Sequence, residues 1–167
     1  MNQPKKLNLG CGTDIRKGYI NLDSAPLKGV DAVHDLDKFP YPFKDNQFTE
    51  VIANHVLEHV QDLMKVMQEL SRICKPNAII KVRVPFYHSH GAFQDPTHKI
   101  FFTMDTFDYF THSTFFDYYA KAKFVIVKRE PIPTSIGKLV PRRLRNYVGM
   151  VLGEIVRELY FELKVVK

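Results

Sequence analysis

The sequence predicts a single α/β domain built on a mostly parallel sheet whose last strand runs antiparallel. Three observations lead to this prediction. An apolar strand at Leu7 and Leu9 runs into a turn with two glycines and then into a second strand that ends on Asp23. The clearest helical periodicity covers residues 56–74, between two segments rich in β-branched residues. Residues 159–166 alternate apolar and polar side chains, which is typical of a strand at the edge of a sheet.

The remaining elements are expected in a simple order along the chain. Pro and Gly interrupt residues 24–29, and residues 39–46 combine Pro with turn-forming Lys-Asp-Asn, so the early helices that normally join parallel strands are expected to be shortened or missing. Further strands are expected at residues 19–22, 30–36, 48–53, 78–85 and 123–128, and further helices at residues 105–110 and 142–155.

Composition places the chain among ordinary globular proteins. It has 167 residues, a length typical of one domain, with 45% hydrophobic and 25% charged residues. No apolar run is long enough to cross a bilayer, and the amino end leads directly into a strand, so a cytoplasmic location is expected. Cys11 and Cys74 form neither a disulfide framework nor a metal-binding pair, and a disulfide between them is not expected in a reducing compartment.

The formal net charge of +6 is concentrated in the carboxyl-terminal third. Residues 132–156 are expected to form a basic amphipathic insertion before the last strand. Such a surface suits a nucleic acid, an anionic membrane surface or an anionic acceptor substrate, although an ordinary solvated surface is the alternative. Basic residues that concentrate the charge in the carboxyl-terminal third include Lys121, Lys123, Lys128, Arg129, Lys138, Arg142, Arg143 and Arg145.

The first turn has the chemistry of a nucleotide-type site. Gly10 and Gly12 allow a sharp bend and a close approach to a ligand, and Asp23 stands where a carboxylate can accept hydrogen bonds from ribose hydroxyls. A dinucleotide site would need a third glycine and a helix before the acid, and both are missing. A ligand with ribose but no pyrophosphate, such as S-adenosylmethionine, fits better, although an ordinary tight turn is the alternative.

Three motifs in this order resemble one family. Leu-Asn-Leu-Gly-Cys-Gly at residues 7–12, Asn-Leu-Asp at 21–23 and Val-Leu-Glu-His at 56–59 are similar to the small class I S-adenosylmethionine-dependent methyltransferases. The resemblance covers residues 5–85 and implies a Rossmann-like sheet, S-adenosylmethionine as cofactor and methyl transfer to an unidentified acceptor. The cofactor-binding residues assigned with it are Gly10, Cys11 and Gly12 for the methionine part, Asp23 for the ribose, Asp35 and Leu36 for the adenine, and Asn54 and His55 beside the methyl group.

The segment after the fifth expected strand carries the candidate catalytic side chains. His88, His90 and His98 are candidate general bases, and Asp95 is placed to orient one of them. These assignments depend on position and chemistry, not on the resemblance. The interpretation assigns no metal ion.

Two other functions remain open at this point. His55, Glu58 and His59 fit the H-x-x-E-H pattern of zinc hydrolases, with a distant acid such as Glu130 or Glu154 as third ligand. A binding module with the same fold but no catalysis is the other alternative, and it would bind the cofactor without turnover.

Overall fold

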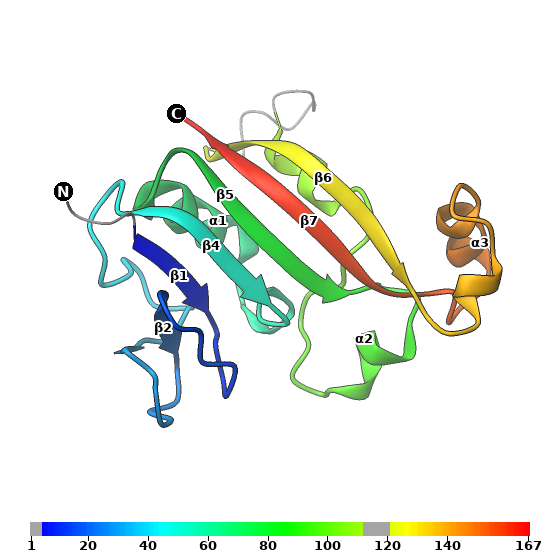
Figure 1. Ribbon diagram of the computed structural model, residues 1–167, viewed down its shortest axis with the longest axis horizontal. Helices are drawn as coiled ribbons and strands as arrows, with labels where there is room; N and C mark the ends of the chain where they lie inside the picture. The colour runs from blue at the N-terminus through cyan, green and yellow to red at the C-terminus, as the bar shows by residue number, and fades with distance from the viewer. Residues whose placement is uncertain (1–4, 112–120) are drawn as a thin grey trace.

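The chain folds around one seven-stranded sheet (Figure 1). The computed structural model describes residues 5–111 and 121–167. The strands stand in the order β3-β2-β1-β4-β5-β7-β6, and β7 runs antiparallel to both of its neighbours while the other four pairs are parallel. The predicted sheet is therefore confirmed. Its strands are β1 (Lys5–Leu9), β2 (Ile20–Asp23), β3 (Ala32–Val33), β4 (Phe48–Asn54), β5 (Cys74–Pro85), β6 (Lys123–Pro133) and β7 (Val156–Val166).

Helices are few, as the early breaker residues predict. In the described part of the chain, residues 10–19, 24–31 and 34–47 contain no helix, so the first four strands are joined by turns and loops. No described helix has the length and apolar composition needed to cross a bilayer. The helical elements are η1 (Leu57–His59), α1 (Leu63–Ile73), α2 (His90–Gln94), η2 (Thr106–Phe110), η3 (Gly137–Leu139) and α3 (Arg145–Val151), the η elements being 3₁₀ turns.

The predicted helix at residues 56–74 is shorter than its periodicity suggests. Helix α1 begins only after Asp62, whose carboxylate accepts a hydrogen bond from the Lys65 N–H at 3.0 Å and so caps the first turn. The helix ends at Ile73, and Pro76 and Asn77 already lie inside β5. The apolar spacing before Asp62 instead belongs to η1, which packs Leu57 into the core.

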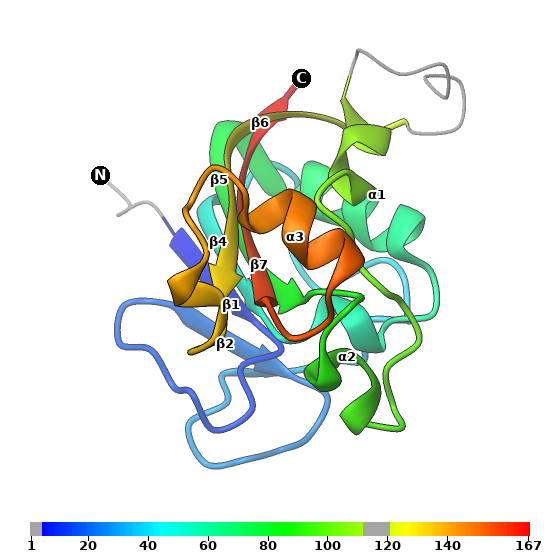
Figure 2. The ribbon, with the colours of Figure 1, turned by 90° about the vertical axis from the view of Figure 1, so that its right-hand side faces the viewer.

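The carboxyl-terminal elements also differ from expectation. The last strand begins at Val156 instead of residue 159, and the helix expected at residues 142–155 is reduced to α3. Helix α3 lies outside the sheet, at one end of β6 and β7 (Figure 1), and it faces the viewer in the end view of Figure 2. Residues 134–155, between β6 and β7, therefore form a separate outer segment.

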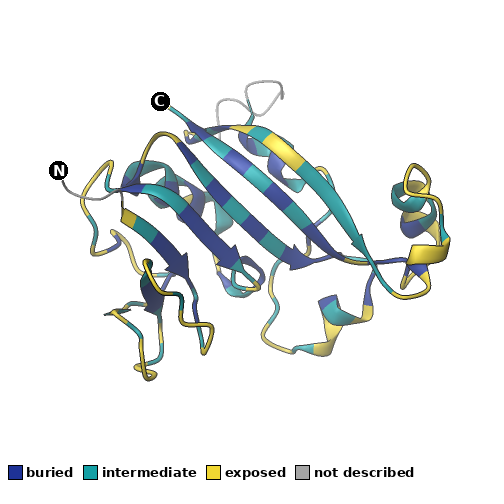
Figure 3. Cartoon of the chain, in the orientation of Figure 1, coloured by how far each residue is buried: buried dark blue, intermediate teal, exposed yellow. Residues whose placement is uncertain are grey.

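The two faces of the sheet have different environments. Helix α1 and η2 lie on one face, behind the sheet in Figure 1, and cover a core that includes Val82, Phe107 and Phe161, all fully buried. The other face has no covering helix among the described residues. Along β5 and β7 in Figure 3, buried and partly exposed positions alternate, as expected for strands covered on one side only.

Cross-strand charge pairs occupy the uncovered face. Lys81 on β5 donates to Glu50 on β4 at 2.8 Å, and Lys6 on β1 lies 3.5 Å from the same carboxylate. On the far strands, Lys128 lies 5.2 Å above the ring of Tyr160, a favourable cation–π contact. Burial would raise the pKa of Glu50, but hydrogen bonds from Lys81 and from a tyrosine lower it overall. This face is thus built to meet water.

Candidate cofactor and acceptor site

The carboxyl ends of the parallel strands meet at one hollow of 450 Å³, which we call the main hollow. Gly10 follows β1, Asp23 ends β2, Asp35 follows β3 and His55 follows β4. In parallel sheets, ligands bind at this edge because the loops that leave the strands can surround them. The lining residues are Gly10, Gly12, Asp23, Ser24, Asp35, Leu36, Asp37, His55, Val56, His59, Val60 and Lys99.

The glycine turn needs both of its glycines, for different reasons. Gly10 and Gly12 have φ angles of +61° and +48°, a region that L side chains rarely adopt. A Cβ on Gly10 would lie 2.1 Å from Cγ2 of Val56, so the turn packs tightly against the segment after β4. A Cβ on Gly12 would meet no atom within 4 Å, since this position faces the hollow.

Asp23 holds the turn and still has capacity for a ligand. Its Oδ2 accepts the Gly12 N–H at 2.7 Å, and its Oδ1 accepts the Ala25 N–H at 3.0 Å. A carboxylate offers about four lone-pair positions, so each oxygen can accept one more hydrogen bond. Two neighbouring hydroxyls of a ribose match that remaining capacity.

A buried amide pair, which the motif analysis did not single out, organises the loop behind the turn. Asn8 is 2% exposed, and its side-chain amide donates to the Asp14 carbonyl at 2.7 Å and to the Asn21 side-chain oxygen at 3.1 Å. The same Asn21 oxygen accepts the Arg16 N–H at 2.9 Å. An Asn that alternates with buried leucines inside a strand is the signal that could have revealed this support, because a buried polar group needs partners.

The predicted adenine side is formed by the loop after β3. Asp35 and Leu36 line the hollow, and so does Asp37, which the sequence analysis missed. The Asp37 carboxylate accepts the Gln61 N–H at 2.7 Å and lies 3.9 Å from the ammonium of Lys99. These contacts tie the β3 loop to the segments that follow η1 and α2.

Two predicted cofactor residues do not line the hollow with their side chains. Cys11 is 4% exposed, and its N–H donates to the Leu22 carbonyl at 2.9 Å. Burial, together with the charge of Asp23, raises the pKa of its thiol. Asn54 is the last residue of β4 and pairs with Arg83 of β5 in the sheet. Any contact that these two positions make with a ligand in the hollow is therefore expected to involve backbone atoms.

His55 and Glu58 separate this hollow from a second one of 370 Å³. The His55 Nδ1 lies 3.3 Å from Oε1 of Glu58, and its Nε2 lies 3.8 Å from Oε2 of Glu158. The hydrogen bond with Glu58 raises the pKa of His55, against the opposing effect of burial. Because His55 and His59 line both hollows, a ligand in one lies beside a ligand in the other. We call the second hollow the acceptor hollow.

The structure divides the predicted catalytic residues into two groups. Asp95 and His98 line the acceptor hollow. His88 and His90 instead line a different hollow with Phe93, Gly153 and Glu154. His88 lies with Nδ1 3.2 Å from the Gly149 carbonyl. The short helix α2 lies between the two hollows, since its Gly91 and Gln94 line the acceptor hollow and its His90 and Phe93 line the other.

The H-x-x-E-H interpretation of residues 55–59 is wrong. That pattern requires two imidazoles one turn apart on a single α-helix. His55 has a φ of +49° and precedes the helical turn, whereas His59 ends the 3₁₀ turn η1. The left-handed residue therefore breaks the helix on which the zinc-hydrolase pattern depends.

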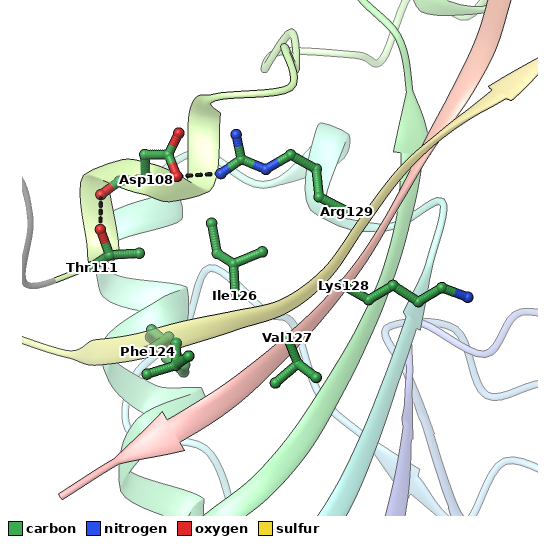
Figure 4. Close-up of a pocket in the computed structure, with 8 residues that line it drawn as sticks. Asp108, Thr111, Phe124, Ile126, Val127, Lys128 and Arg129 are labelled. Atoms are coloured by element: carbon green, nitrogen blue, oxygen red, sulfur yellow. Dashed lines mark hydrogen bonds and ion pairs between the residues drawn. The ribbon is translucent and has the colours of Figure 1, made fainter. Parts of the chain in front are cut away.

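Another hollow, of 590 Å³, lies at the opposite edge of the sheet, where β6 faces η2 (Figure 4). Arg129 reaches across it to Asp108, and the Thr111 hydroxyl donates to the Asp108 carbonyl at 2.9 Å. None of the predicted cofactor or catalytic residues lines it. Residues 112–120, next along the chain, lie outside the described residues.

The chemistry of the main hollow suits S-adenosylmethionine. The glycine turn leaves open space at Gly12, as a ligand that approaches the backbone requires. Asp23, Asp35 and Asp37 surround the hollow with three carboxylates, which suit hydroxyl and amino donors and a cationic sulfonium. Phosphate groups would instead meet like charge there.

Comparisons with known proteins agree with this site. Residues 10–82 match the family described as methyltransferase domain. Demethylmenaquinone methyltransferase of Desulfitobacterium hafniense (strain Y51) is 29% identical over 66 residues, which cover 40% of this chain and 26% of that protein. The chain thus matches about a quarter of the length of this curated relative.

Solved structures share the fold across the whole chain. An S-adenosylmethionine-dependent methyltransferase from Archaeoglobus fulgidus superposes with a TM-score of 0.67 at 19% identity, covering 98% of this chain and 86% of that one. One from Mesorhizobium loti gives a TM-score of 0.55 at 14% identity, covering 96% and 90%. The [4+2]-cyclase SpnF gives 0.64 at 14% identity, covering 98% and 74%, so the fold alone does not fix the reaction.

The family match and these neighbours support S-adenosylmethionine as the cofactor of the main hollow. The match includes the glycine turn and Asp23, and the fold extends beyond it to the last strand. Residues 10–82 therefore match the methyltransferase-domain family, within a chain that has the Rossmann-like fold seen in S-adenosylmethionine-dependent methyltransferases.

Proposed function

We propose that this protein transfers a methyl group from S-adenosylmethionine to an oxygen, nitrogen or carbon nucleophile of a small or anionic acceptor. One observation carries the proposal. The glycine turn, Asp23 and His55 meet around one hollow, and His55 also lines the acceptor hollow next to it. A methyl donor and its acceptor need this adjacency.

The residues around the main hollow have separate tasks in this proposal. The backbone at residues 10–12 binds the amino-acid part, and Asp23 accepts the ribose hydroxyls while it keeps its bond to Gly12. Asp35 accepts the adenine amino group, and Leu36 packs on the ring. His55 stands where the methyl group points toward the acceptor.

When bound, S-adenosylmethionine supplies an electrophilic methyl group on a sulfonium. The acceptor forms its new bond to carbon as the sulfur–carbon bond breaks, and the electron pair of that bond stays on sulfur. If the acceptor must lose a proton, His98 in the acceptor hollow is the predicted residue that takes it. Holding both reactants in line is the main contribution of the protein, worth several kcal/mol of the barrier, roughly 7–11 at most.

Lys99, which lines the main hollow, and Arg157, which lines the acceptor hollow, are the side chains that would meet an anionic acceptor. Both already lie beside acids, Lys99 3.9 Å from Asp37 and Arg157 2.8 Å from Glu158, so an anionic acceptor would compete with these pairs. A cytoplasmic location is part of the proposal, because both cysteines are buried free thiols, as is usual in reducing compartments. Fractionation of cells tests that location.

Calorimetric titration with S-adenosylmethionine and with its demethylated product tests the cofactor. We expect Asp23→Asn to weaken binding by about 10- to 100-fold, since it loses charge-assisted hydrogen bonds to the ribose. Asp31→Asn is the matched control. Asp31 also accepts hydrogen bonds within the loop region, from the backbone and side chain of Asn21 at 2.8 and 3.0 Å, but it does not line the hollow.

A second measurement separates catalysis from binding alone. Folded protein is incubated with S-adenosylmethionine and a panel of hydroxylated and carboxylated small molecules, and mass spectrometry follows the methylated product. Cofactor binding with a methylated acceptor supports the enzyme. Binding that persists without turnover across the panel favours the non-catalytic module, and no binding by folded wild type refutes the cofactor assignment.

A further inference from the structure

Three side chains with metal-ligand chemistry meet between the two hollows. Glu58, His59 and His98 each bring one ligand atom within 4.8 Å of the others. Glu58 is 1% exposed, and its Oε2 has no hydrogen-bond partner among the described residues. A buried carboxylate oxygen without a partner is costly, so its environment calls for a cation.

The hydrogen bond of His98 fixes which of its ring nitrogens can bind a metal. Its Nδ1 lies 2.9 Å from the carbonyl oxygen of Ala92. Because a carbonyl oxygen only accepts, Nδ1 must carry the proton, and in the neutral imidazole, the form that binds a metal, Nε2 carries the lone pair. That Nε2 lies 4.0 Å from Oε1 of Glu58.

The same reasoning applies to His59 through one more residue. Its Nδ1 lies 2.9 Å from the hydroxyl oxygen of Thr97, and that hydroxyl donates its only proton to Asp95 at 2.7 Å. The Thr97 oxygen must therefore accept from Nδ1–H of His59, so in the neutral imidazole Nε2 carries the lone pair. Asp95 thus orients His59, although the sequence analysis expected it to orient a histidine of its own segment.

We propose that Glu58, His59 and His98 bind a divalent transition-metal ion, with Zn²⁺ or Mn²⁺ as the leading candidates. Two imidazoles and one carboxylate form a common ligand set for such ions, whereas Mg²⁺ and Ca²⁺ prefer oxygen ligands alone. Both imidazoles donate their other N–H to a fixed acceptor, which is the usual support of metal-binding histidines.

The spacing is close to that of a formed site. With metal–ligand distances of about 2.0–2.2 Å, neighbouring ligand atoms in a tetrahedral site lie roughly 3.3–3.5 Å apart. The 4.0 Å between His98 and Glu58 therefore needs only a small side-chain rotation. Three protein ligands leave one or more positions of the ion open.

The role of the ion rests on the proposed function, but its binding does not. His59 lines both hollows, so an ion at Glu58 lies on the acceptor side of the cofactor. Its open positions would bind oxygen atoms of the acceptor and promote loss of a hydroxyl proton to solvent. With the ion bound, His98 holds the metal through Nε2, so it does not also serve as the base. The acceptor class is then a compound methylated at a hydroxyl that has a second oxygen nearby to chelate the ion.

Metal content of untagged, full-length protein tests the site. Protein is dialysed with Zn²⁺ or Mn²⁺, separated from free ion and analysed by mass spectrometry of the metal, and calorimetry gives the affinity. We expect one ion per chain in wild type and about 100-fold weaker binding in Glu58→Gln, His59→Ala and His98→Ala. Thr97→Val, which keeps all three ligands, should weaken binding by about 10- to 100-fold. His90→Ala removes an exposed imidazole outside the cluster and should bind as wild type does.

Equal metal binding by wild type and all variants would overturn the proposal, and so would no binding by folded wild type. Circular dichroism checks that each variant is folded. If an alanine variant is unfolded, Glu58→Gln and Thr97→Val still test the site, because they keep the side-chain volume. Titration with S-adenosylmethionine in a chelator is done in parallel. Metal binding without cofactor binding would refute the proposed function and leave the metal site standing.

A separate observation concerns the segment at residues 134–155, which exposes apolar and basic side chains together. Leu139 is 85% and Val151 78% exposed. Exposed positions appear throughout this outer segment in Figure 3. We call the following set the α3 surface: Ile136, Lys138, Leu139, Arg142, Arg143, Leu144, Tyr147, Met150, Val151 and Leu152.

We propose that the α3 surface binds the headgroup region of an anionic lipid bilayer. Exposed aliphatic side chains next to arginines match the boundary between acyl chains and anionic headgroups. A nucleic acid would be met by basic and aromatic residues, and Tyr147 is the one aromatic residue of this surface. Both apolar burial and charge should therefore contribute to binding.

Sedimentation with phosphatidylcholine vesicles, with and without phosphatidylglycerol, tests this surface. The double variant Leu139→Ser with Val151→Ser should lower partitioning into the anionic vesicles by about tenfold or more, and Arg142→Gln with Arg143→Gln should remove the preference for anionic lipid. The control is Val125→Ser with Val127→Ser, which changes two exposed valines of β6. Binding to single-stranded RNA without binding to vesicles would overturn the proposal, as would vesicle binding that the apolar variant leaves unchanged.

Discussion

Alanine at Gly10 should mainly lower the stability of the protein, whereas alanine at Gly12 should mainly weaken cofactor binding. Both residues have positive φ, so either substitution carries a backbone penalty of about 1–2 kcal/mol. At Gly10, the new Cβ would also lie 2.1 and 2.6 Å from Cγ2 and Cβ of Val56, which adds overpacking of about 1–3 kcal/mol. Gly10→Ala should therefore lower the free energy of unfolding by roughly 2–5 kcal/mol, and Gly12→Ala by about 1–2.

Cofactor affinity should follow the opposite order in protein that remains folded. The Cβ of Gly12→Ala enters the open space where the ligand lies, so binding of S-adenosylmethionine should weaken by about tenfold or more, the equivalent of 1.4 kcal/mol. Urea unfolding measures the first effect and calorimetric titration measures the second. Each variant thus serves as the control for the other.

A double-mutant cycle tests the cause at Gly10. Combining Gly10→Ala with Val56→Gly removes both atoms that the new Cβ would meet, so the two substitutions should show a favourable coupling of about 1–3 kcal/mol. Equal destabilisation by the two alanines, no coupling with Val56, or unchanged cofactor affinity in Gly12→Ala would refute this account of the turn.

Three further predictions concern the support of the site. Arg72→Met should lower stability by about 2–3 kcal/mol at pH 7, because Arg72 holds Glu69 with two hydrogen bonds of 2.9 and 2.7 Å. Burial would raise the pKa of Glu69, but these bonds lower it overall from its ordinary 4.5. The stabilisation they give is therefore present above pH 4.5 and is lost as the pH falls through the lower pKa of the folded protein. The stability of Arg72→Met should depend less steeply on pH in that acid range than the stability of wild type. Cys11 and Cys74 should react with a thiol reagent only after urea unfolding, because both are buried and burial raises both pKa values, that of Cys74 to about 12. Asn8→Ala should lower the unfolding free energy by about 1–3 kcal/mol, since it removes both hydrogen bonds that the buried Asn8 amide donates, to the Asp14 carbonyl and to the Asn21 side-chain oxygen.

Local patterns were sufficient to predict the sheet and much of the main hollow. Strands with continuous apolar residues and turns with obligatory glycines have strong local causes, so the mostly parallel sheet and the turn with Gly10, Gly12 and Asp23 could be anticipated, whereas the spatial order of the strands was not predicted. The start of α1 could not be predicted from periodicity, because the helical spacing of apolar residues extends to both sides of Asp62, whereas the helix begins only after it. The sequence signal for the start of α1 was its capping residue, Asp62. The left-handed backbone of His55 could not be predicted, because no glycine marks that position.

The acceptor side was harder to predict because it depends on distant residues. Glu58 and His98 come together only because the segment after β5 folds back, with Phe86 bridged to Phe102 beside the strand ends. Within that segment, sequence alone gives His88, His90 and His98 equal standing, and the direction of the short helix α2 decides among them. Such choices are set by tertiary packing and not by residue spacing.

The missing early helices explain the electrostatics of the site. In a dinucleotide-binding sheet, a helix begins at the glycine turn, and its amino end attracts phosphate. Here no helix follows the turn, and the Gly12 N–H is bonded to the carboxylate of Asp23. With Asp35 and Asp37 on the same hollow, the local charge is negative, which favours a cationic sulfonium over a pyrophosphate. Loss of those helices uncovers one face of the sheet, and the paired charges of Glu50 and Lys81 make that exposure stable.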